Sequence, residues 1–461
     1  MDDSSFVRTR RTQTANAWDI AKGTVLIASG LPLPIAGTDG YHDFHAHPEF
    51  TYLAGVGVAA AVLAFDPGEG WSLFAPVASL EERVWVGDGR ALAEIAAASG
   101  IEQVQPSHAL GDWLEARRGE PLALAGNHDF LQRPGAYGLQ RWQVLEATVD
   151  EAASERLSMV IAEQRRAKSA DEIGRMRAAV EASVPGHLAA MRLALPGMSE
   201  RQLQVEVEAE FFRHGGDRTA YGSIVGSGPN AAILHSTPGG RLLCEGDLVL
   251  VDAAAEFAGY ASDITRTFPV ARQFSGIQRD LYQLVHKVQQ AAIDAVRPGV
   301  EYRDLHLQAC QRIATGLVDL GILRGKPQDL VERDAHALFF PHGLGHMIGL
   351  STHDAGGCLA GRMPSDRFGL KWLRADLPLG EHYVVTVEPG IYFIPAILED
   401  PALRETFRDA VNWSRVDSLM PFGGIRIEDD VLVTQTGSEV LSAAIPKSIA
   451  GVEALRQEGR S

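Results

Sequence analysis

Two β-rich runs joined by a short turn, residues 246–270, constrain the fold more than any other segment. The numbers of facing residues in an antiparallel hairpin sum to a constant, so a turn centred between Phe257 and Ala258 places Asp252 opposite Asp263. Facing side chains share one side of the sheet, and the apolar run before Asp252 predicts that this side is buried. The alternative is a surface hairpin with two solvated carboxylates. Two buried like charges need a cation between them, so the hairpin favours a metal site.

A second segment, residues 341–354 (PHGLGHMIGLSTHD), holds three of the chain's 15 histidines. Its glycines weaken a regular helix, so we predict a loop that wraps closely around a site. A single buried histidine is usually a core residue with satisfied hydrogen bonds, but three histidines within one short loop favour a function. Imidazole is a common metal ligand and an acid or base near neutral pH. The candidates are His342, His346 and His353.

Two glutamates follow in β-like segments nearer the C-terminus. Glu388 is predicted at the end of a strand that Pro389 stops, and Glu428 is predicted within a strand whose alternation puts Arg426 on the same face. Taken singly, each glutamate is weak evidence, because a surface position explains it. Together with the two aspartates and a histidine, they form an oxygen-rich ligand set that suits Mn²⁺, Co²⁺ or Zn²⁺.

The length of 461 residues predicts two domains. We place the boundary near Arg165, with an N-terminal α/β domain at residues 1–164 and a catalytic α+β domain at residues 165–461. In the first domain the segments TVLIASG, FTYLAGV, AAAVLAFDPG and WSLFAP are predicted strands, and the domain shows no catalytic pattern. In the second, Ser169 followed by Glu172 is a candidate capping box that begins a helix.

Charge and cysteine content exclude several classes of protein. The net charge of −17 leaves little basic surface to neutralise phosphates, so we expect no nucleic-acid partner. The three cysteines lie far apart, which fits a reducing compartment and excludes a disulfide framework. The N-terminus lacks the apolar core of a secretory signal, and the longest apolar run, residues 54–65, is too short to span a bilayer. We therefore expect a cytoplasmic protein with no membrane partner.

An ordered ligand set makes the chain similar to the pita-bread metallopeptidases, which include methionine aminopeptidase, aminopeptidase P and prolidase: Asp252, Asp263, His346, Glu388 and Glu428. The resemblance covers roughly residues 165–445. It implies a pita-bread fold and two divalent metal ions per subunit, with Mn²⁺ preferred and Co²⁺ or Zn²⁺ as alternatives. Asp252 would hold one ion, His346 and Glu388 the other, while Asp263 and Glu428 would bridge both. The N-terminal domain resembles the creatinase-type domain of aminopeptidase P and prolidase.

Within this family the chain is most similar to prolidase, which hydrolyses Xaa-Pro dipeptides. In prolidases an arginine precedes the glutamate of the EPG motif by the same spacing that separates Arg374 from Glu388, and its implied role is to grip the substrate carboxylate. The alternative is an Xaa-Pro aminopeptidase that acts on longer peptides. From a different class, a metal-free relative such as creatinase, or a non-catalytic interaction protein, would lose ligand positions, and none is lost here.

The resemblance also implies a mechanism for an Xaa-Pro peptidase. A hydroxide that bridges the two ions would attack the carbonyl before proline, with Glu388 as the proton shuttle. His342 and His353 would support the tetrahedral intermediate, and His235 would lie near the proline. The implied substrate-binding set is Arg374, His235, His353 and Arg426. The implied partners are Xaa-Pro dipeptides or short proline-containing peptides, and a second copy of the chain in a homodimer.

Overall fold

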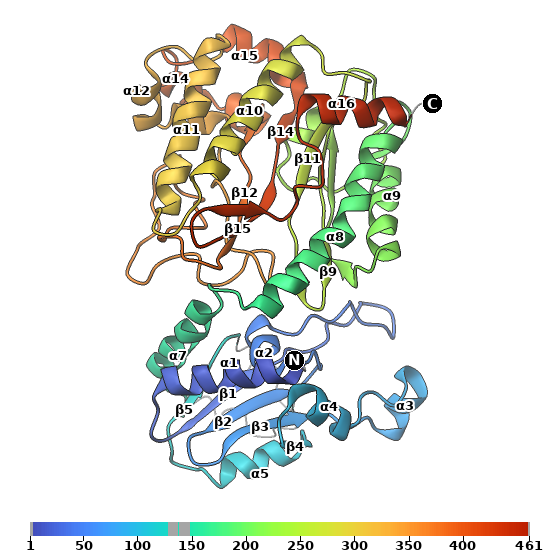
Figure 1. Ribbon diagram of the computed structural model, residues 1–461, viewed down its shortest axis with the longest axis vertical. Coiled ribbons are helices and arrows are strands. Elements are labelled where there is room, and N and C mark those ends of the chain that lie inside the picture. The colour runs from blue at the N-terminus through green and yellow to red at the C-terminus, as the bar shows by residue number, and fades with distance from the viewer. Residues whose placement is uncertain (1–2, 128–136, 138–147, 460–461) are drawn as a thin grey trace. The chain divides into compact units, whose positions relative to one another are not determined.

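The computed structural model describes residues 3–127, 137 and 148–459. The chain divides into two compact units, Met1–Arg165 and Arg166–Ser461, drawn in Figure 1. The boundary predicted from the sequence falls one residue earlier. Within the described ranges, no helix combines the length and the apolar composition needed to cross a membrane.

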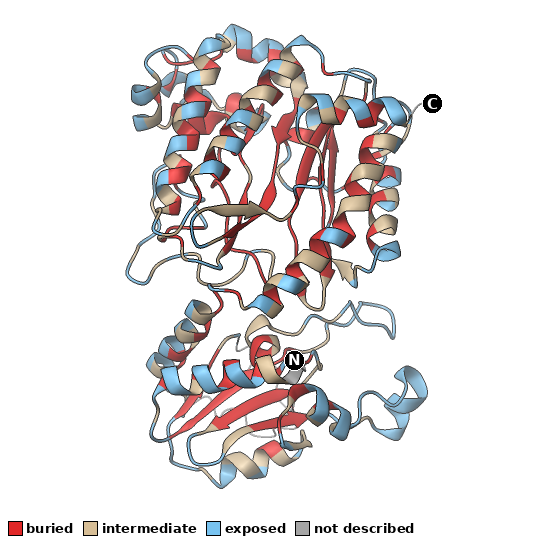
Figure 2. Cartoon of the chain, viewed as in Figure 1, coloured by how far each residue is buried: buried red, intermediate tan, exposed pale blue. Residues whose placement is uncertain are grey.

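The first unit is built around a mixed sheet with the strand order β4-β3-β2-β1-β5. β1 pairs antiparallel with β2 and parallel with β5, while β3 pairs parallel with β4. β1, β2, β5 and most of β3 are buried and carry the unit's core, while β4 at the edge is partly exposed (Figure 2). The described elements are β1 (Thr24–Ala28), β2 (Val62–Asp66), β3 (Gly70–Ala75), β4 (Gln103–Pro106), β5 (Leu122–Leu124), α1 (Asp3–Trp18), α2 (Pro48–Ala54), α3 (Leu80–Val86), α4 (Leu92–Ser99), α5 (Ala109–Glu115) and α7 (Glu151–Gln164).

One predicted strand of this unit is wrong, because FTYLAGV lies largely in helix α2. Pro48 occupies the first turn, where a backbone N–H has no helical partner, and Gly55 ends the helix in the left-handed conformation at φ 70°. Phe50, Leu53 and Ala54 are buried at helical spacing on one face. The segment is too short for its apolar period to be read from the sequence. The other three predicted strands form as β1, β2 and β3.

The second unit is α+β, with small antiparallel sheets flanked by long helices (Figure 1). The sheets have the orders β10-β9-β6, β11-β8-β7, β12-β15-β16 and β13-β14. Helices α8 and α9 pack on each other and on β9, while α10 packs on α11, β12 and β14. The strands are β6 (Arg218–Thr219), β7 (Ile224–Ser227), β8 (Leu248–Asp252), β9 (Ala255–Phe257), β10 (Tyr260–Ala261), β11 (Thr265–Pro269), β12 (Val384–Val387), β13 (Gly390–Tyr392), β14 (Gly424–Arg426), β15 (Asp429–Val433) and β16 (Ser438–Val440). The helices are α8 (Ala170–Leu193), α9 (Glu200–Arg213), α10 (Gly276–Ala295), α11 (Tyr302–Asp319), α12 (Pro327–Glu332), α13 (Pro395–Leu398), α14 (Pro401–Thr406), α15 (Trp413–Leu419) and α16 (Ile449–Glu458), with short 3₁₀ turns at Gly228–Ala232, Ala335–Leu338 and Met420–Phe422.

Helix α8 begins where the sequence predicts. The Ser169 backbone N–H donates to Glu172 Oε2 at 2.8 Å, and the Glu172 N–H donates to Ser169 Oγ at 3.4 Å, which confirms the capping box. Gly186 then lets α9 approach closely, since a Cβ at this position would lie 2.3 Å from the Phe211 ring. The paired helices contact β6, β7, β9 and β10. β8 lies between β7 and β11 in its sheet, and it ends at Asp252, the first of the acidic residues described next.

Candidate metal centre

The hairpin that carries the two aspartates has a register two residues away from the predicted one. Asp252, the last residue of β8, pairs with Thr265 rather than with Asp263. The turn is Ala258–Gly259, with φ values of 50° and 81°, and two left-handed residues are typical of a tight type I′ turn. The turn centre therefore lies one residue later than predicted. Because the register changes by an even number, Asp263 still lies on the side of Asp252.

A cavity of about 880 Å³ collects every residue that the sequence singled out for chemistry. Its lining includes Asp252, Asp263, His346, Glu388, Glu428, His235, His342, His353, Arg374 and Arg426. These side chains come from six separate stretches of the second unit: residue 235, residues 252–263, residues 342–353, residue 374, residue 388 and residues 426–428. The fold thus brings them together, while the individual roles assigned to them stay predictions.

Three of the predicted ligands form a tight buried group. Asp263, His346 and Glu428 each offer a ligand atom, and these atoms all lie within 4.8 Å of one another. His346 Nε2 lies 3.4 Å from Asp263 Oδ2 and 3.7 Å from Glu388 Oε1. Asp252 and Glu388 line the same cavity and complete an arrangement of four carboxylates around one imidazole.

The loop predicted over residues 341–354 is confirmed, and it presents His346 in a defined orientation. His346 Nδ1 lies 3.0 Å from the Met347 carbonyl, so it donates there and leaves Nε2 facing the carboxylates. Gly345 makes this approach possible, because a Cβ would lie 2.2 Å from the Thr386 carbonyl oxygen and 2.3 Å from Tyr302 Oη. A metal-binding imidazole needs this kind of fixed tautomer.

The two glutamates lie at breaks between strands. Glu388 directly follows β12, as predicted. Glu428, predicted inside a strand, instead lies in the gap between β14 and β15, where it forms an isolated bridge with Thr265. Thr265 Oγ1 donates to Glu428 Oε2 at 2.6 Å. The bridge exists because β14 and β15 pair with different partner strands, β13 and β12, so the chain must leave one ladder before it enters the next.

Burial and crowded negative charge together shift the pKa values of this cluster. Burial raises the pKa of Glu388 to about 7. Burial, and then the charges of Asp263 and Glu388, raise the pKa of Glu428 well above its usual range. Burial alone would lower the pKa of His346, but the hydrogen bond with Asp263 and the charge of Glu388 outweigh it and raise that pKa to about 9. A buried, anion-rich donor set of this kind fits divalent cations, which would supply the missing positive charge.

Two tyrosines that the sequence analysis did not select, Tyr221 and Tyr392, complete the hydrogen bonding. Tyr221 Oη donates to Asp252 Oδ1 at 2.6 Å, and Arg426 Nη2 donates to Asp252 Oδ2. Tyr392 Oη lies 2.9 Å from both Arg426 Nη1 and His342 Nε2. The alternation in GIYF after the EPG motif could have indicated Tyr392. No spacing relates Tyr221 to Asp252, because their contact arises only when β8 packs beside the preceding loop.

The rim of the cavity holds the remaining predicted residues. Arg374 Nη1 lies 3.2 Å from His353 Nδ1, and the His353 ring stands at 87° to that of His346 with 4.4 Å between centroids. The backbone at Arg374 is fixed by a close approach to Gly357, where a Cβ would lie 2.4 Å from the Arg374 carbonyl oxygen. His235 lines the cavity from a loop before β8. Arg374, His353 and His235 are exposed, as rim residues that meet incoming peptide would be.

The donor set defines the class of protein, which is one built to hold divalent cations among carboxylates and an imidazole. Comparison with known proteins then identifies the family. The model of "Metallopeptidase family M24" matches residues 174–435, and that of "Aminopeptidase P, N-terminal domain" matches residues 7–120. The chain belongs to metallopeptidase family M24. The fold predicted from the sequence, a pita-bread domain preceded by a creatinase-like α/β domain, is thereby confirmed.

Individual relatives carry two kinds of name. The chain is 40% identical over 296 residues to the Xaa-Pro aminopeptidase of Haemophilus influenzae, in an alignment that covers 64% of this chain and 62% of that protein. It is 42% identical over 273 residues to the Xaa-Pro dipeptidase of Shewanella woodyi, covering 58% and 61%. Among solved structures, Pseudomonas aeruginosa aminopeptidase PepP matches with a TM-score of 0.83 and 32% identity, covering 99% of this chain and 98% of that one. The chain thus spans less than two thirds of the length of these two sequence relatives, but nearly all of the solved structure.

Proposed function

We propose that this chain is a metal-dependent Xaa-Pro aminopeptidase, which releases the N-terminal residue of peptides that carry proline in the second position. The observation that carries this proposal is the buried carboxylate–imidazole cluster at the base of a cavity of about 880 Å³. That volume is near the upper end of the roughly 300–1,000 Å³ usual for ligand pockets. The lining extends beyond the ligand cluster to Arg201 and Gln204 of α9, which offers surface for a peptide longer than two residues.

The relatives support the aminopeptidase over the dipeptidase that the sequence alone favours. The first unit matches the N-terminal domain of aminopeptidase P, and the solved structure that covers 99% of this chain is named aminopeptidase PepP. The Arg374 guanidinium already contacts His353, so it has a role that does not require a substrate carboxylate. Prolidase remains the second candidate, supported by the spacing of Arg374 before Glu388 and by the likeness to the Shewanella woodyi dipeptidase.

Five residues would hold two divalent ions, Mn²⁺ by preference, in the arrangement predicted from the sequence: Asp252, Asp263, His346, Glu388 and Glu428. When bound, such ions lower the pKa of a bound water and polarise the peptide carbonyl. Arg426 and Tyr221 orient Asp252 by donating to its two oxygens. Thr265 does the same for Glu428. The carboxylates of Asp252 and Glu428 are therefore held in place before any substrate arrives.

Two groups of the chain act directly on substrate in this proposal. Glu388 accepts the proton of the attacking water and returns it to the proline nitrogen, because its oxygens face both His346 and His342 at the cavity base. His353, beside Arg374 at the rim, donates a hydrogen bond to the oxygen on which negative charge develops. His342 and Arg426 meet at Tyr392 Oη and form the wall against which the proline side packs.

The test compares peptide lengths on the purified chain with and without Mn²⁺. We expect kcat/KM for Ala-Pro-Ala to exceed that for Ala-Pro, with release of free alanine, and both activities to disappear on chelation. A preference for Ala-Pro would move the assignment to prolidase. Cleavage that persists after full removal of metal would contradict both assignments. The cytoplasmic location and the homodimer stay predictions from the sequence.

A further inference from the structure

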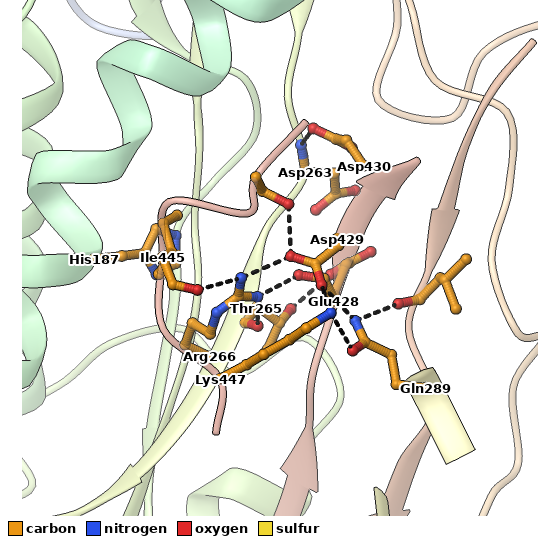
Figure 3. A network of polar contacts seen from close by, with 12 residues as sticks. His187, Asp263, Thr265, Arg266, Gln289, Glu428, Asp429, Asp430, Ile445 and Lys447 are labelled. Atoms are coloured by element: carbon orange, nitrogen blue, oxygen red, sulfur yellow. Dashed lines mark hydrogen bonds and ion pairs between the residues drawn. The ribbon is translucent and has the colours of Figure 1, made fainter. Parts of the chain in front are cut away.

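A largely buried group of charged side chains lies beside Glu428 (Figure 3). We call it the charge cluster and define it as Arg266, Asp429 and Lys447. Arg266 and Asp429 are fully buried, with Arg266 Nη2 2.6 Å from Asp429 Oδ1. Lys447 Nζ lies 2.6 Å from Asp429 Oδ2. In the described part of the chain, none of the three lines the cavity, so none contacts substrate.

Asp429 has its hydrogen-bonding capacity filled by four donors. Oδ1 accepts from Arg266 and from Ser442 Oγ, each at 2.6 Å. Oδ2 accepts from Lys447 at 2.6 Å and from Gln289 Nε2 at 2.8 Å. A buried charge pair is tolerated only with geometry this complete. With two cations and one anion, the charge cluster also places one net positive charge near a carboxylate-rich cavity.

Arg266 connects the charge cluster to Glu428. Its Nη1 donates to the main-chain carbonyl of Glu428 at 2.6 Å and to that of Thr265 at 2.9 Å. These two residues are themselves joined, since the Glu428 N–H donates to the Thr265 carbonyl at 3.1 Å and Thr265 Oγ1 donates to the Glu428 carboxylate at 2.6 Å. One guanidinium therefore ties the two backbones at the point where the Glu428 side chain leaves for the cavity.

Gln289 connects the charge cluster to the second glutamate. Its Nε2 donates to the main-chain carbonyl of Val387 at 3.3 Å, one residue before Glu388. Its Oε1 accepts from Lys447 Nζ at 2.8 Å. Lys447 thus holds both Asp429 and Gln289, and through them the backbones that carry both glutamates (Figure 3).

The lysine comes from a segment outside the family match, which ends at residue 435. Ser442, Ile445 and Lys447 follow β16, and the Ile445 carbonyl accepts from Arg266 at 3.0 Å. Tyr282 Oη of α10 donates to the Lys447 carbonyl at 2.9 Å, which anchors the segment. Residues 442–447 therefore complete a polar network that the matched domain alone would leave with an underpaired aspartate.

We infer that Lys447 is a positioning residue for the metal centre, acting through Asp429, Arg266 and Gln289 to hold Glu428 and Glu388 ready for divalent cations. The inference rests on one part of the proposed function, which is that these two glutamates bind metal. Partners that orient metal ligands from behind change metal affinity or activity by about 10- to 100-fold when they are removed.

The experiment measures the Mn²⁺ dissociation constant of the purified full chain by chelator competition, beside kcat, KM and the melting temperature. Lys447→Met keeps the apolar stem and removes the ammonium, and we expect Mn²⁺ binding to weaken by about 10-fold or more. Lys447→Arg should restore most of the affinity. Arg177→Met is the matched control, because Arg177 pairs with Glu439 at 2.5 Å in a half-exposed ion pair outside the cavity. It should leave the Mn²⁺ affinity unchanged.

A lower melting temperature with wild-type Mn²⁺ affinity in Lys447→Met would show a structural role alone and would overturn the inference. If Lys447→Met does not fold, Ser442→Ala removes one donor from Asp429 instead. Weaker Mn²⁺ binding by that variant supports the inference, and unchanged binding overturns it. The metal measurement needs no peptide, so wild-type protein that binds Mn²⁺ but cleaves no Xaa-Pro peptide would refute the proposed function while the inference still stands on the affinity of the variants.

Discussion

Arg374 Nη1 and His353 Nδ1 lie 3.2 Å apart at the rim of the cavity, so the arginine holds a histidine that lines the cavity. In an aminopeptidase this contact serves peptides of every length. Arg374→Ala should therefore reduce kcat/KM for Ala-Pro-Ala and Ala-Pro by similar factors. If Arg374 instead grips a dipeptide carboxylate, the loss of one charge partner is worth about 2–5 kcal/mol, or roughly 30-fold or more, on Ala-Pro alone. Steady-state kinetics on the two substrates distinguishes these outcomes.

Bound metal should stabilise the folded protein as well as make it active. Asp263 and Glu428 bring negative charge into a buried space beside His346, and a cation would offset that charge. Ligand at a hundredfold excess over its dissociation constant adds about 2.7 kcal/mol to the free energy of unfolding. We expect the melting temperature of the wild type to rise with Mn²⁺ concentration. Asp263→Asn should show neither the rise nor turnover, while its circular dichroism stays native. A chelated protein with full activity would contradict the metal centre.

Glu388→Gln tests the proton shuttle. Glutamine keeps an oxygen for the metal but loses the basic site, so kcat should fall far more than the affinity for substrate. A general acid–base contribution is typically about 10²- to 10⁴-fold. Metal content is the necessary control and should be measured on the same samples. Near-normal kcat at full metal occupancy would assign the proton transfer to another group.

Gly345→Ala tests whether the histidine loop depends on close backbone contact. A Cβ there would lie 2.2 Å from the Thr386 carbonyl oxygen, and both residues adjoin the His346 backbone contact with β12. Overpacking of this kind is worth about 1–3 kcal/mol, and the displaced loop should weaken Mn²⁺ binding. The control is Gly174→Ala in α8, where a Cβ would meet nothing within 4 Å. That change should be neutral or stabilising by up to about 1 kcal/mol, as expected when alanine replaces glycine in a helix.

His306 in helix α11 should make the stability of the fold sensitive to acid. Burial lowers the pKa of His306 to about 4, helped by the charge of Arg303 and opposed by the hydrogen bond to the Gly369 carbonyl and by Asp334. The folded pKa of His306 lies below the unfolded value of about 6.5. The free energy of unfolding is therefore unaffected by this histidine above pH 6.5, and it decreases as the pH falls toward 4. At pH 4.5 the loss should be about 2–3 kcal/mol. Urea unfolding should show a smaller decline for His306→Gln, and an equal decline would assign it to other groups.

Much of the candidate site was predictable because several of the candidate ligands stand beside a local feature that the sequence alone reveals. Asp252 ends an apolar strand, His346 lies among glycines, and Glu388 precedes a proline. Such features depend on neighbours in the chain, through backbone sterics and the alternation of strands. Residue type then specifies the chemistry, since carboxylates and imidazole are ligands for hard and borderline cations.

The tertiary structure alone decided the register of the hairpin, the contacts of Tyr221 and the charge cluster beside Glu428. A one-residue difference in the turn centre changes every pair across the strands. Lys447 reaches Asp429 only because residues 442–447 return along β15 and α10. Contacts of this kind join residues that are remote in the chain, and packing sets them. The sequence therefore determines which residue types can bind a metal, while the fold determines which groups hold those residues in place.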